Sequence, residues 1–283
     1  MHTTKSHAEK KSRHLPYRLC AIDLDDTLLA PDKSVSKENI LAVKRLQDAG
    51  LKVVIASGRE HGSCMHYQKM LSLDGPVVSC QGALVKHPLD DKVLYEESLD
   101  VKLVEEILNH AVDFETTVIF SCSAGTFTGH QNKWTDMYEK LTSQKLNLIE
   151  NWSDHYEKRP YKIQWLDEAD RMVLHRPRIK QEILDQTYWF AYEKIHIEFL
   201  SLHANKGAGL ASVADHYGID QKEVVCFGDA ENDISMLKWA GQSIAMSHAR
   251  AGVREAAKLV APEGAPETSL ARAVDLLFAQ DGK

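Results

Sequence analysis

The sequence predicts an α/β fold in which a parallel-sheet core is interrupted by an inserted α/β domain. Two observations predict it. Short, continuously apolar segments alternate with helical patterns at both ends of the chain, which is typical of strands buried on both faces of a parallel sheet. Between about residues 86 and 200 the pattern changes to shorter amphipathic strands and helices. A chain of 283 residues that is 43% hydrophobic can bury a core in each of two modest domains.

The first part of the chain predicts a β-α-β-α-β unit. The expected elements are a strand at Leu19–Ile22, a helix from Ser36 to Gly50, a strand at Leu51–Ala56, a helix around His61–Leu73 and a strand at Val77–Cys80. Ser36 is a typical helix N-cap, and Gly50 is a typical residue after a helix C-terminus. Successive parallel strands joined by helices build one sheet with right-handed crossovers.

The second part of the chain continues the same alternation after the insertion. We expect a helix from Lys206 to Gly218, a strand at Val224–Phe227 and a strand at Ser243–Met246. Within the insertion, the expected elements are Val93–Glu96, Val101–Ala111, Thr116–Ser121 and Lys162–Leu166. The predicted division is a disordered basic tail over 1–16, a core over 17–85 and 201–283, and an insertion over 86–200. Hinges are expected near Gly82–Pro88 and Leu200–Asn205.

Two carboxylates follow the first predicted strand. Asp23 and Asp25 come directly after Leu19–Ile22, and strand alternation would direct both side chains to the same side. A charge at the end of a buried strand is costly without a partner, so a divalent cation or a phosphoryl group is expected beside it. One Asp can attack phosphorus while the other transfers a proton. The alternative is an acidic turn with no chemistry.

Two further segments supply groups that bind phosphate. Ser57, Gly58 and Arg59 follow the second predicted strand, where a hydroxyl and backbone N–H groups could hold phosphate oxygens. Arg59 could either orient Ser57 or pair with an acid. Lys206 begins a predicted helix, where its ammonium could reach a bound phosphate.

The segment after Val224–Phe227 predicts a metal site. It contains Asp229, Asn232 and Asp233. Mg²⁺ prefers hard oxygen ligands, so Asp229 would complete a site with Asp23 and the backbone carbonyl of Asp25. Asp233 is expected to support that site without binding the metal directly.

In the order of these motifs the chain resembles the haloacid dehalogenase (HAD) superfamily. The run Gly228–Asp233 reads Gly-Asp-x-x-Asn-Asp and is followed by Ser243–Met246, which resembles the Cof-type sugar-phosphate phosphatases of that superfamily. The resemblance implies a Rossmann-like core with an inserted cap domain of the C2B type, which closes over the site and sets substrate choice. Asp26, Gln81 and His248 depart from the family pattern.

The resemblance also implies roles for individual residues. Asp23 would be the nucleophile, and Asp25 the general acid and then the general base. The implied phosphate contacts are the backbone amide of Leu24, Ser57, Gly58, Lys206 and Asn232.

Composition limits the partners. A net charge of −7 argues against nucleic acid and anionic membranes as partners, and no stretch approaches the roughly 20 apolar residues of a membrane span. The basic N-terminal residues lack the apolar run of a signal peptide. The five cysteines include no CxxC pair, which favours reduced thiols in the cytoplasm. The oligomeric state is left open.

These observations predict an Mg²⁺-dependent phosphomonoester hydrolase that acts on sugar phosphates or similar small metabolites through an aspartyl phosphate. Two alternatives remain open at this point. One is phosphomannomutase-like transfer, in which the phosphoryl group returns to a sugar. The other is a phosphosugar-binding regulator with an idle active site, because a fold does not determine a function.

Overall fold

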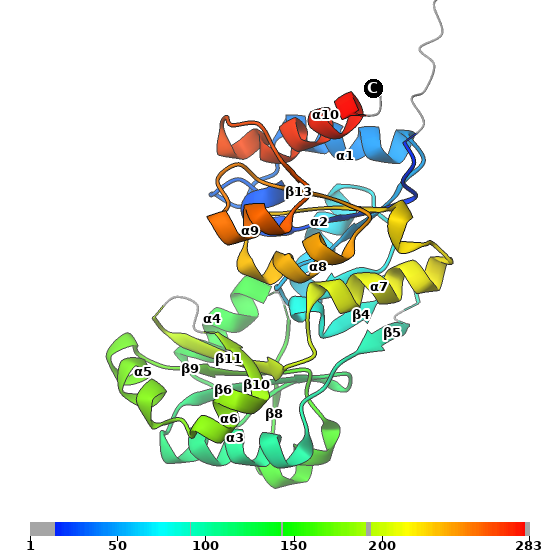
Figure 1. Cartoon of the computed structure of the whole chain (residues 1–283). Helices are drawn as coiled ribbons and strands as arrows, with labels where there is room; N and C mark the ends of the chain where they lie inside the picture. Colours follow the sequence, from blue (N-terminus) through cyan, green and yellow to red (C-terminus); the bar gives the residue numbers. More distant parts are fainter. Residues whose placement is uncertain (1–14, 91, 143, 191–193, 281–283) are drawn as a thin grey trace, which may run out of the picture.

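The computed structural model describes residues 15–90, 92–142, 144–190 and 194–280, and it has two lobes (Figure 1). Most of the predicted tail, residues 1–14, lies outside the described residues. Leu15 was predicted to belong to that tail, but it is buried in the core with 2% of its surface exposed. The described chain therefore joins the core two residues earlier than expected, because an apolar side chain is available to pack there.

A five-stranded parallel sheet forms the core, in the order β14-β13-β12-β1-β2. Its strands are β1 (Leu19–Ile22), β2 (Lys52–Ile55), β12 (Val224–Gly228), β13 (Gln242–Ala245) and β14 (Leu259–Val260). Side chains of β1 alternate between the two faces: Cys20 and Ile22 join one apolar cluster, whereas Leu19 and Ala21 join the other. The continuous apolar run of β1 therefore reflects burial on both faces.

Helices cover both faces of this sheet. They are α1 (Lys37–Asp48), α2 (His61–Met70), α7 (Lys206–Tyr217), α8 (Ile234–Trp239), α9 (Ala251–Ala256) and α10 (Ser269–Gln280). Apolar residues of α1, α2 and α10 pack in one cluster, and those of α7, α8 and α9 pack in the other. The predicted N-cap is confirmed, since the Ser36 hydroxyl accepts a hydrogen bond of 3.1 Å from the Asn39 amide. The α/β fold class is likewise confirmed.

The third predicted strand and the first strand of the predicted insertion lie together in a small antiparallel sheet. It contains β3 (Val77–Ser79), β4 (Leu84–Lys86) and β5 (Val93–Glu96). One parallel bridge, between Ala56 and Val78, joins β3 to the end of β2. The placement of Val93–Glu96 in the insertion is corrected, because this strand pairs with β4 and its Leu94 and Tyr95 pack against the core.

The second lobe, which we call the cap, is built on a six-stranded sheet in the order β10-β11-β9-β6-β7-β8. Its strands are β6 (Thr117–Cys122), β7 (Gly125–Thr128), β8 (Asn147–Leu148), β9 (Lys162–Leu166), β10 (Thr187–Phe190) and β11 (His196–Ser201). Its helices are α3 (Val101–Asp113), α4 (Lys133–Thr142), α5 (Ala169–His175) and α6 (Gln181–Gln186). The division of the chain at 86 and 200 stays a prediction; the pairing of β5 favours a boundary after Glu96.

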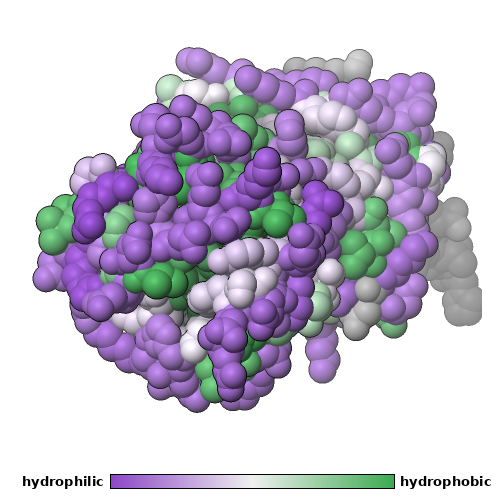
Figure 2. Space-filling model, turned by 90° about the horizontal axis from the view of Figure 1, so that it is seen from below, coloured by the Kyte–Doolittle hydropathy of each residue, from purple (hydrophilic) through white to green (hydrophobic). Residues whose placement is uncertain are grey.

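Short helical turns complete the described chain: η1 (Leu24–Leu28), η2 (Cys80–Gly82), η3 (Trp152–Lys158), η4 (Arg176–Arg178), η5 (Gln221–Glu223), η6 (Glu231–Asp233) and η7 (Pro266–Thr268). Seen from below, the molecule is mostly hydrophilic, with separate hydrophobic patches (Figure 2). Among the described residues, no helix has the length and apolar character that crossing a membrane requires.

Candidate active site

Asp23 lies at the carboxyl end of β1 and contacts Lys206 at the first position of α7. The Lys206 ammonium is fully buried and donates to Asp23 Oδ1 at 2.5 Å and to Asp233 Oδ1 at 2.6 Å. The Asn205 side chain caps α7 by accepting from the Ala208 amide, which places Lys206 at the start of the helix. The structure thus brings together three of the predicted residues from three separate segments.

Asp233 supports the loop after β12. Its second oxygen, Oδ2, accepts hydrogen bonds from the backbone amides of Asp229 at 2.9 Å and Ala230 at 3.0 Å. Because both carboxylate oxygens of Asp233 already have partners and the residue is fully buried, its contacts fit a supporting role.

The carboxylate of Asp25 is held by two cations. Arg59 donates from Nε to Oδ2 and from Nη2 to Oδ1, both at 2.7 Å, and Lys33 donates to Oδ1 at 2.8 Å. Burial alone would raise the pKa of Asp25, but the hydrogen bonds from Arg59 and Lys33 outweigh burial and lower the pKa to about 2. Of the two roles open to Arg59, pairing with an acid is the one that the structure shows for its guanidinium.

The prediction that strand alternation directs Asp23 and Asp25 to the same side is wrong for Asp25, which lies beyond the strand. Strand β1 ends at Ile22, and residues Leu24–Leu28 form a helical turn in which Asp26 has a φ of 58°. Alternation between faces is a property of extended strands, so it cannot orient Asp25. The contact with Arg59 orients that side chain instead.

Three carboxylates form a cluster that could hold a cation. Oxygens of Asp23, Asp229 and Asp233 lie within 4.8 Å of one another. Thr27 Oγ1 donates to Asp229 Oδ1 at 2.7 Å, and the His248 ring lies 3.7 Å from Asp229 Oδ2. Hard oxygen donors of this kind suit Mg²⁺. The predicted contribution of Asp25, through its backbone carbonyl, stays a prediction.

The electrostatics of Asp23 agree with a need for positive charge. Burial raises the pKa of Asp23 well above its ordinary value, and the carboxylates of Asp233 and Asp229 raise it further, whereas Lys206 lowers it. The nearby Asp229 carboxylate raises the pKa of His248. A divalent cation in the cluster would favour the ionised form of Asp23, which is the form that can act as a nucleophile.

The predicted phosphate-binding loop has little free space. The Ser57 side chain is buried and its Oγ accepts from the Arg59 amide at 3.2 Å. A Cβ atom at Gly58 would collide with the side-chain amide of Gln81. Asn232 Nδ2 donates to Gln81 Oε1 at 2.8 Å, so Gln81 connects the loop to Asn232. Leu24 is fully buried, and the contact of its backbone amide with phosphate stays a prediction.

Sequence reasoning did not assign a role to three residues that contact the site: Thr27, Lys33 and Gln81. Thr27 and Lys33 lie within ten residues of Asp23, so their position next to the carboxylate motif was the available signal. Gln81 follows the predicted strand Val77–Cys80, and the carboxyl ends of strands in open α/β sheets are where ligands bind.

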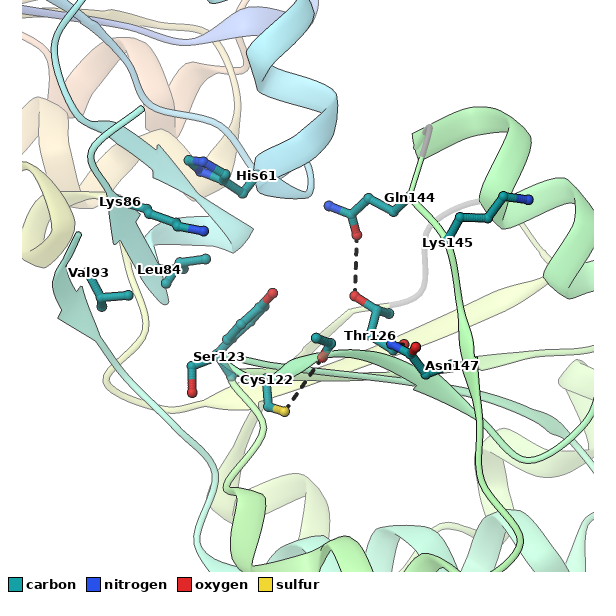
Figure 3. Close-up of a pocket in the computed structure, with 12 residues that line it drawn as sticks. His61, Leu84, Lys86, Val93, Cys122, Ser123, Thr126, Gln144, Lys145 and Asn147 are labelled. Atoms are coloured by element: carbon teal, nitrogen blue, oxygen red, sulfur yellow. Dashed lines mark hydrogen bonds between the residues drawn. The ribbon is translucent and has the colours of Figure 1, made fainter. Parts of the chain in front are cut away.

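A pocket of about 290 Å³ lies between the two lobes (Figure 3). The core lines one side of the pocket with His61, Leu84, Lys86 and Val93, and the cap lines the other with Cys122, Ser123, Gly125, Thr126, Gln144, Lys145, Asn147 and Tyr161. None of the predicted catalytic or phosphate-binding residues is among them. The pocket is therefore separate from the cluster around Asp23.

The family of haloacid dehalogenase-like hydrolases matches residues 20–273. The chain therefore belongs to this family, as its motif order and its parallel sheet with polar groups at the strand ends had indicated. The expected phosphatase of HAD type is confirmed at this level, and the resemblance to Cof-type proteins of subclass IIB is confirmed as one of fold.

Individual relatives cover most of the chain. A 5-amino-6-(5-phospho-D-ribitylamino)uracil phosphatase of Bacillus subtilis is 29% identical over 247 residues, which are 86% of this chain and 90% of the relative. A haloacid dehalogenase-like hydrolase from Bacteroides thetaiotaomicron has a TM-score of 0.79 at 22% identity, covering 93% of this chain and 100% of that one. A subclass IIB sugar phosphatase has a TM-score of 0.73 at 19% identity, covering 92% and 99%. The two solved structures show the shared fold.

Proposed function

We propose that this protein is an Mg²⁺-dependent phosphomonoester hydrolase that acts on sugar phosphates or similar small phosphorylated metabolites through an aspartyl phosphate on Asp23. The observation that carries the proposal is the buried contact of Lys206 with both Asp23 and Asp233, next to the carboxylate of Asp229. The buried Lys206 ammonium places a positive charge where negative charge would develop on the phosphoryl oxygens during transfer.

The residues present fit a bound Mg²⁺. Asp23 and Asp229 would hold the ion together with the backbone carbonyl of Asp25, and Asp233 would keep Asp229 and Lys206 in place. When bound, the ion neutralises charge on the carboxylates and on the phosphoryl oxygens. The phosphoryl group would be held by Lys206 and by the other predicted contacts, which are the Leu24 amide, Ser57, Gly58 and Asn232.

The proposed reaction has two steps. In the first, a carboxylate oxygen of Asp23 forms a bond to phosphorus as the bond from phosphorus to the leaving oxygen breaks, and Asp25 gives its proton to the leaving alcohol. In the second, Asp25 takes a proton from water, and the hydroxide attacks phosphorus and releases phosphate and the Asp23 carboxylate. Because Arg59 and Lys33 keep Asp25 ionised in this structure, Asp25 must leave at least one of these cations and take up a proton from water before the first step.

Compartment and partners belong to the same proposal. All five cysteines are free and buried, which supports a reducing compartment such as the cytoplasm. A small phosphorylated metabolite is the partner that the site accounts for.

The experiment is phosphate release from a panel of phosphorylated metabolites, with Mg²⁺ or with EDTA. The panel includes sugar phosphates and the ribitylaminouracil phosphate named for the Bacillus subtilis relative. We expect release that EDTA abolishes and that Asp23→Asn lacks, with the fold of the variant checked by circular dichroism. Transfer of phosphate to another position of the sugar, without release, would favour the mutase. Binding without any turnover would favour the regulator.

A further inference from the structure

The cap sheet has two chemically different faces. On β11, Ile197 and Phe199 point to the apolar cluster that contains residues of α3, α5 and α6. Glu198 lies between them in the strand, so its side chain points to the opposite face. On β9, Ile163 and Trp165 belong to the apolar cluster in the same way. We call the opposite face the inner face of the cap sheet.

The inner face is polar although it is buried. Gln164 pairs with Glu198 across β9 and β11, and their exposed fractions are 7% and 6%. Lys162, two residues before Gln164, is also on this face and forms an ion pair with Glu60 of the core, with 2.6 Å between Nζ and Oε1. Glu60 directly follows Arg59, the residue that binds Asp25. The inner face therefore connects to the catalytic loop.

Hydrogen bonding on the inner face is uneven. Gln164 Nε2 donates to Glu198 Oε1 at 2.6 Å, and Lys162 and His196 approach the same oxygen at 3.5 and 3.6 Å. The other oxygen, Glu198 Oε2, is buried and receives no hydrogen bond from the residues that the structure describes, and neither does Gln164 Oε1. A buried acceptor without a donor is destabilising, and natural proteins rarely retain one without a reason.

The negative charge of Glu198 raises the cost of leaving its Oε2 atom without a hydrogen bond. Burial would raise the pKa of Glu198, but Lys162 and His196 outweigh burial and lower it. The side chain is thus an ionised carboxylate with hydrogen bonds from Gln164 and Lys162 on one oxygen and none on the other. A ligand that brings donors would complete both this carboxylate and the amide of Gln164.

We propose that Gln164 and Glu198 form the leaving-group site of the enzyme and bind hydroxyl or amino groups of the phosphorylated metabolite through Gln164 Oε1 and Glu198 Oε2. This inference rests on the proposed function and names the substrate class: a leaving group with at least two neighbouring hydrogen-bond donors, as in a sugar or a polyol. It makes Gln164 and Glu198 specificity-determining residues of the cap.

The inner face lies close to the phosphoryl site. Tyr188 pairs with Leu200 on β11, so it lies on the same face as Glu198. Leu200, Cys80 and Ala204 belong to one buried cluster, against which Tyr188 packs. Cys80 directly precedes Gln81, which contacts Asn232, and Ala204 lies two residues before Lys206.

The charge of the site also limits the substrate. The negative carboxylate of Glu198 would repel a second phosphate on the leaving group, because sites that bind phosphate normally present cations. Lys162 is already paired with Glu60 and Glu198. The leaving group is therefore one without a second phosphate, which disfavours a mutase that acts on sugar bisphosphates.

The test compares two substrates in two variants. Glu198→Gln and Gln164→Met are assayed with a sugar phosphate and with p-nitrophenyl phosphate, whose leaving group brings no such pair of donors. We expect kcat/KM for the sugar phosphate to fall about 10- to 100-fold in each variant, the usual effect of losing a hydrogen bond to a charged or buried group. Activity on p-nitrophenyl phosphate is expected to stay within about 3-fold.

The matched control is Glu182→Gln, which removes an exposed carboxylate of the cap on α6 and is expected to change neither activity. An equal loss on both substrates, or no loss on either, would overturn the assignment of Gln164 and Glu198. Calorimetric binding of the sugar phosphate separates this outcome from failure of the proposed function. If wild type binds it without turnover and Glu198→Gln weakens binding, the site stands and the hydrolase is wrong; equal binding by both proteins overturns the site.

Discussion

Lys162→Met tests the energetics of the contact between cap and core. The Lys162 ammonium is 2% exposed and lies 2.6 Å from Glu60 Oε1 and 3.5 Å from Glu198 Oε1. Methionine keeps the approximate length of the side chain and removes the charge. Two buried carboxylates then lose their shared cation, so the change removes one partner of a buried ion pair.

The expected loss in the free energy of unfolding at pH 7 is about 3–5 kcal/mol, the usual range for breaking a buried pair and leaving a charge behind. The double variant Glu60→Gln/Lys162→Met should lose less than Lys162→Met alone, because it removes one of the stranded charges. Lys44→Met is the control: it breaks an exposed pair of 3.3 Å with Asp48 and should change stability by no more than about 0.5 kcal/mol.

The pH dependence gives a second, independent readout. In wild type the pKa of Glu198 is lowered, so its contribution to stability is present above its unfolded pKa and is lost as pH falls through the folded value. In Lys162→Met, burial acts on Glu198 without its main compensating charge and raises the pKa. The variant should then gain stability relative to wild type between pH 7 and pH 5.

Urea unfolding followed by tryptophan fluorescence at both pH values measures these differences, since Trp165 is fully buried in the cap. A loss below about 1 kcal/mol for Lys162→Met, or equal responses of variant and wild type to the lower pH, would refute the view that Lys162 neutralises buried carboxylates.

Three further predictions concern the site itself. Arg59→Ala should raise the pKa of Asp25 from about 2 toward its ordinary value, observed as a carboxyl NMR titration at higher pH; an unmoved titration would contradict the assigned contact. Thr27→Val should free the Asp229 carboxylate and weaken Mg²⁺ binding by about 10-fold in calorimetry, and unchanged affinity would count against Asp229 as a ligand. Gly58→Ala should weaken inhibition by inorganic phosphate, because its methyl group collides with the adjacent glutamine amide; an unaltered inhibition constant would remove Gly58 from the phosphate loop.

The sequence determined the local features of this protein. The apolar run Leu19–Ile22 predicted β1 with its observed bounds, and Ser36 predicted the start of α1. Both signals act over a few residues, through burial of alternate side chains and through one capping hydrogen bond. The order of Asp23, Ser57, Lys206 and Asp229 along the chain indicated the family for the same reason: each follows or begins an element that its neighbours specify.

Only the tertiary structure decided which of these groups meet. Lys206 binds Asp23 across 183 positions of sequence, and Arg59 binds Asp25 across 34. The sequence left the partner of Arg59 open, because several acids could reach a flexible guanidinium until packing selects one. Tertiary packing likewise placed Val93–Glu96 in the small antiparallel sheet beside β4, where Leu94 and Tyr95 pack against the core. It also turned Gln164 and Glu198 toward the same buried face. Such contacts depend on how distant elements pack, and local sequence patterns do not encode that packing.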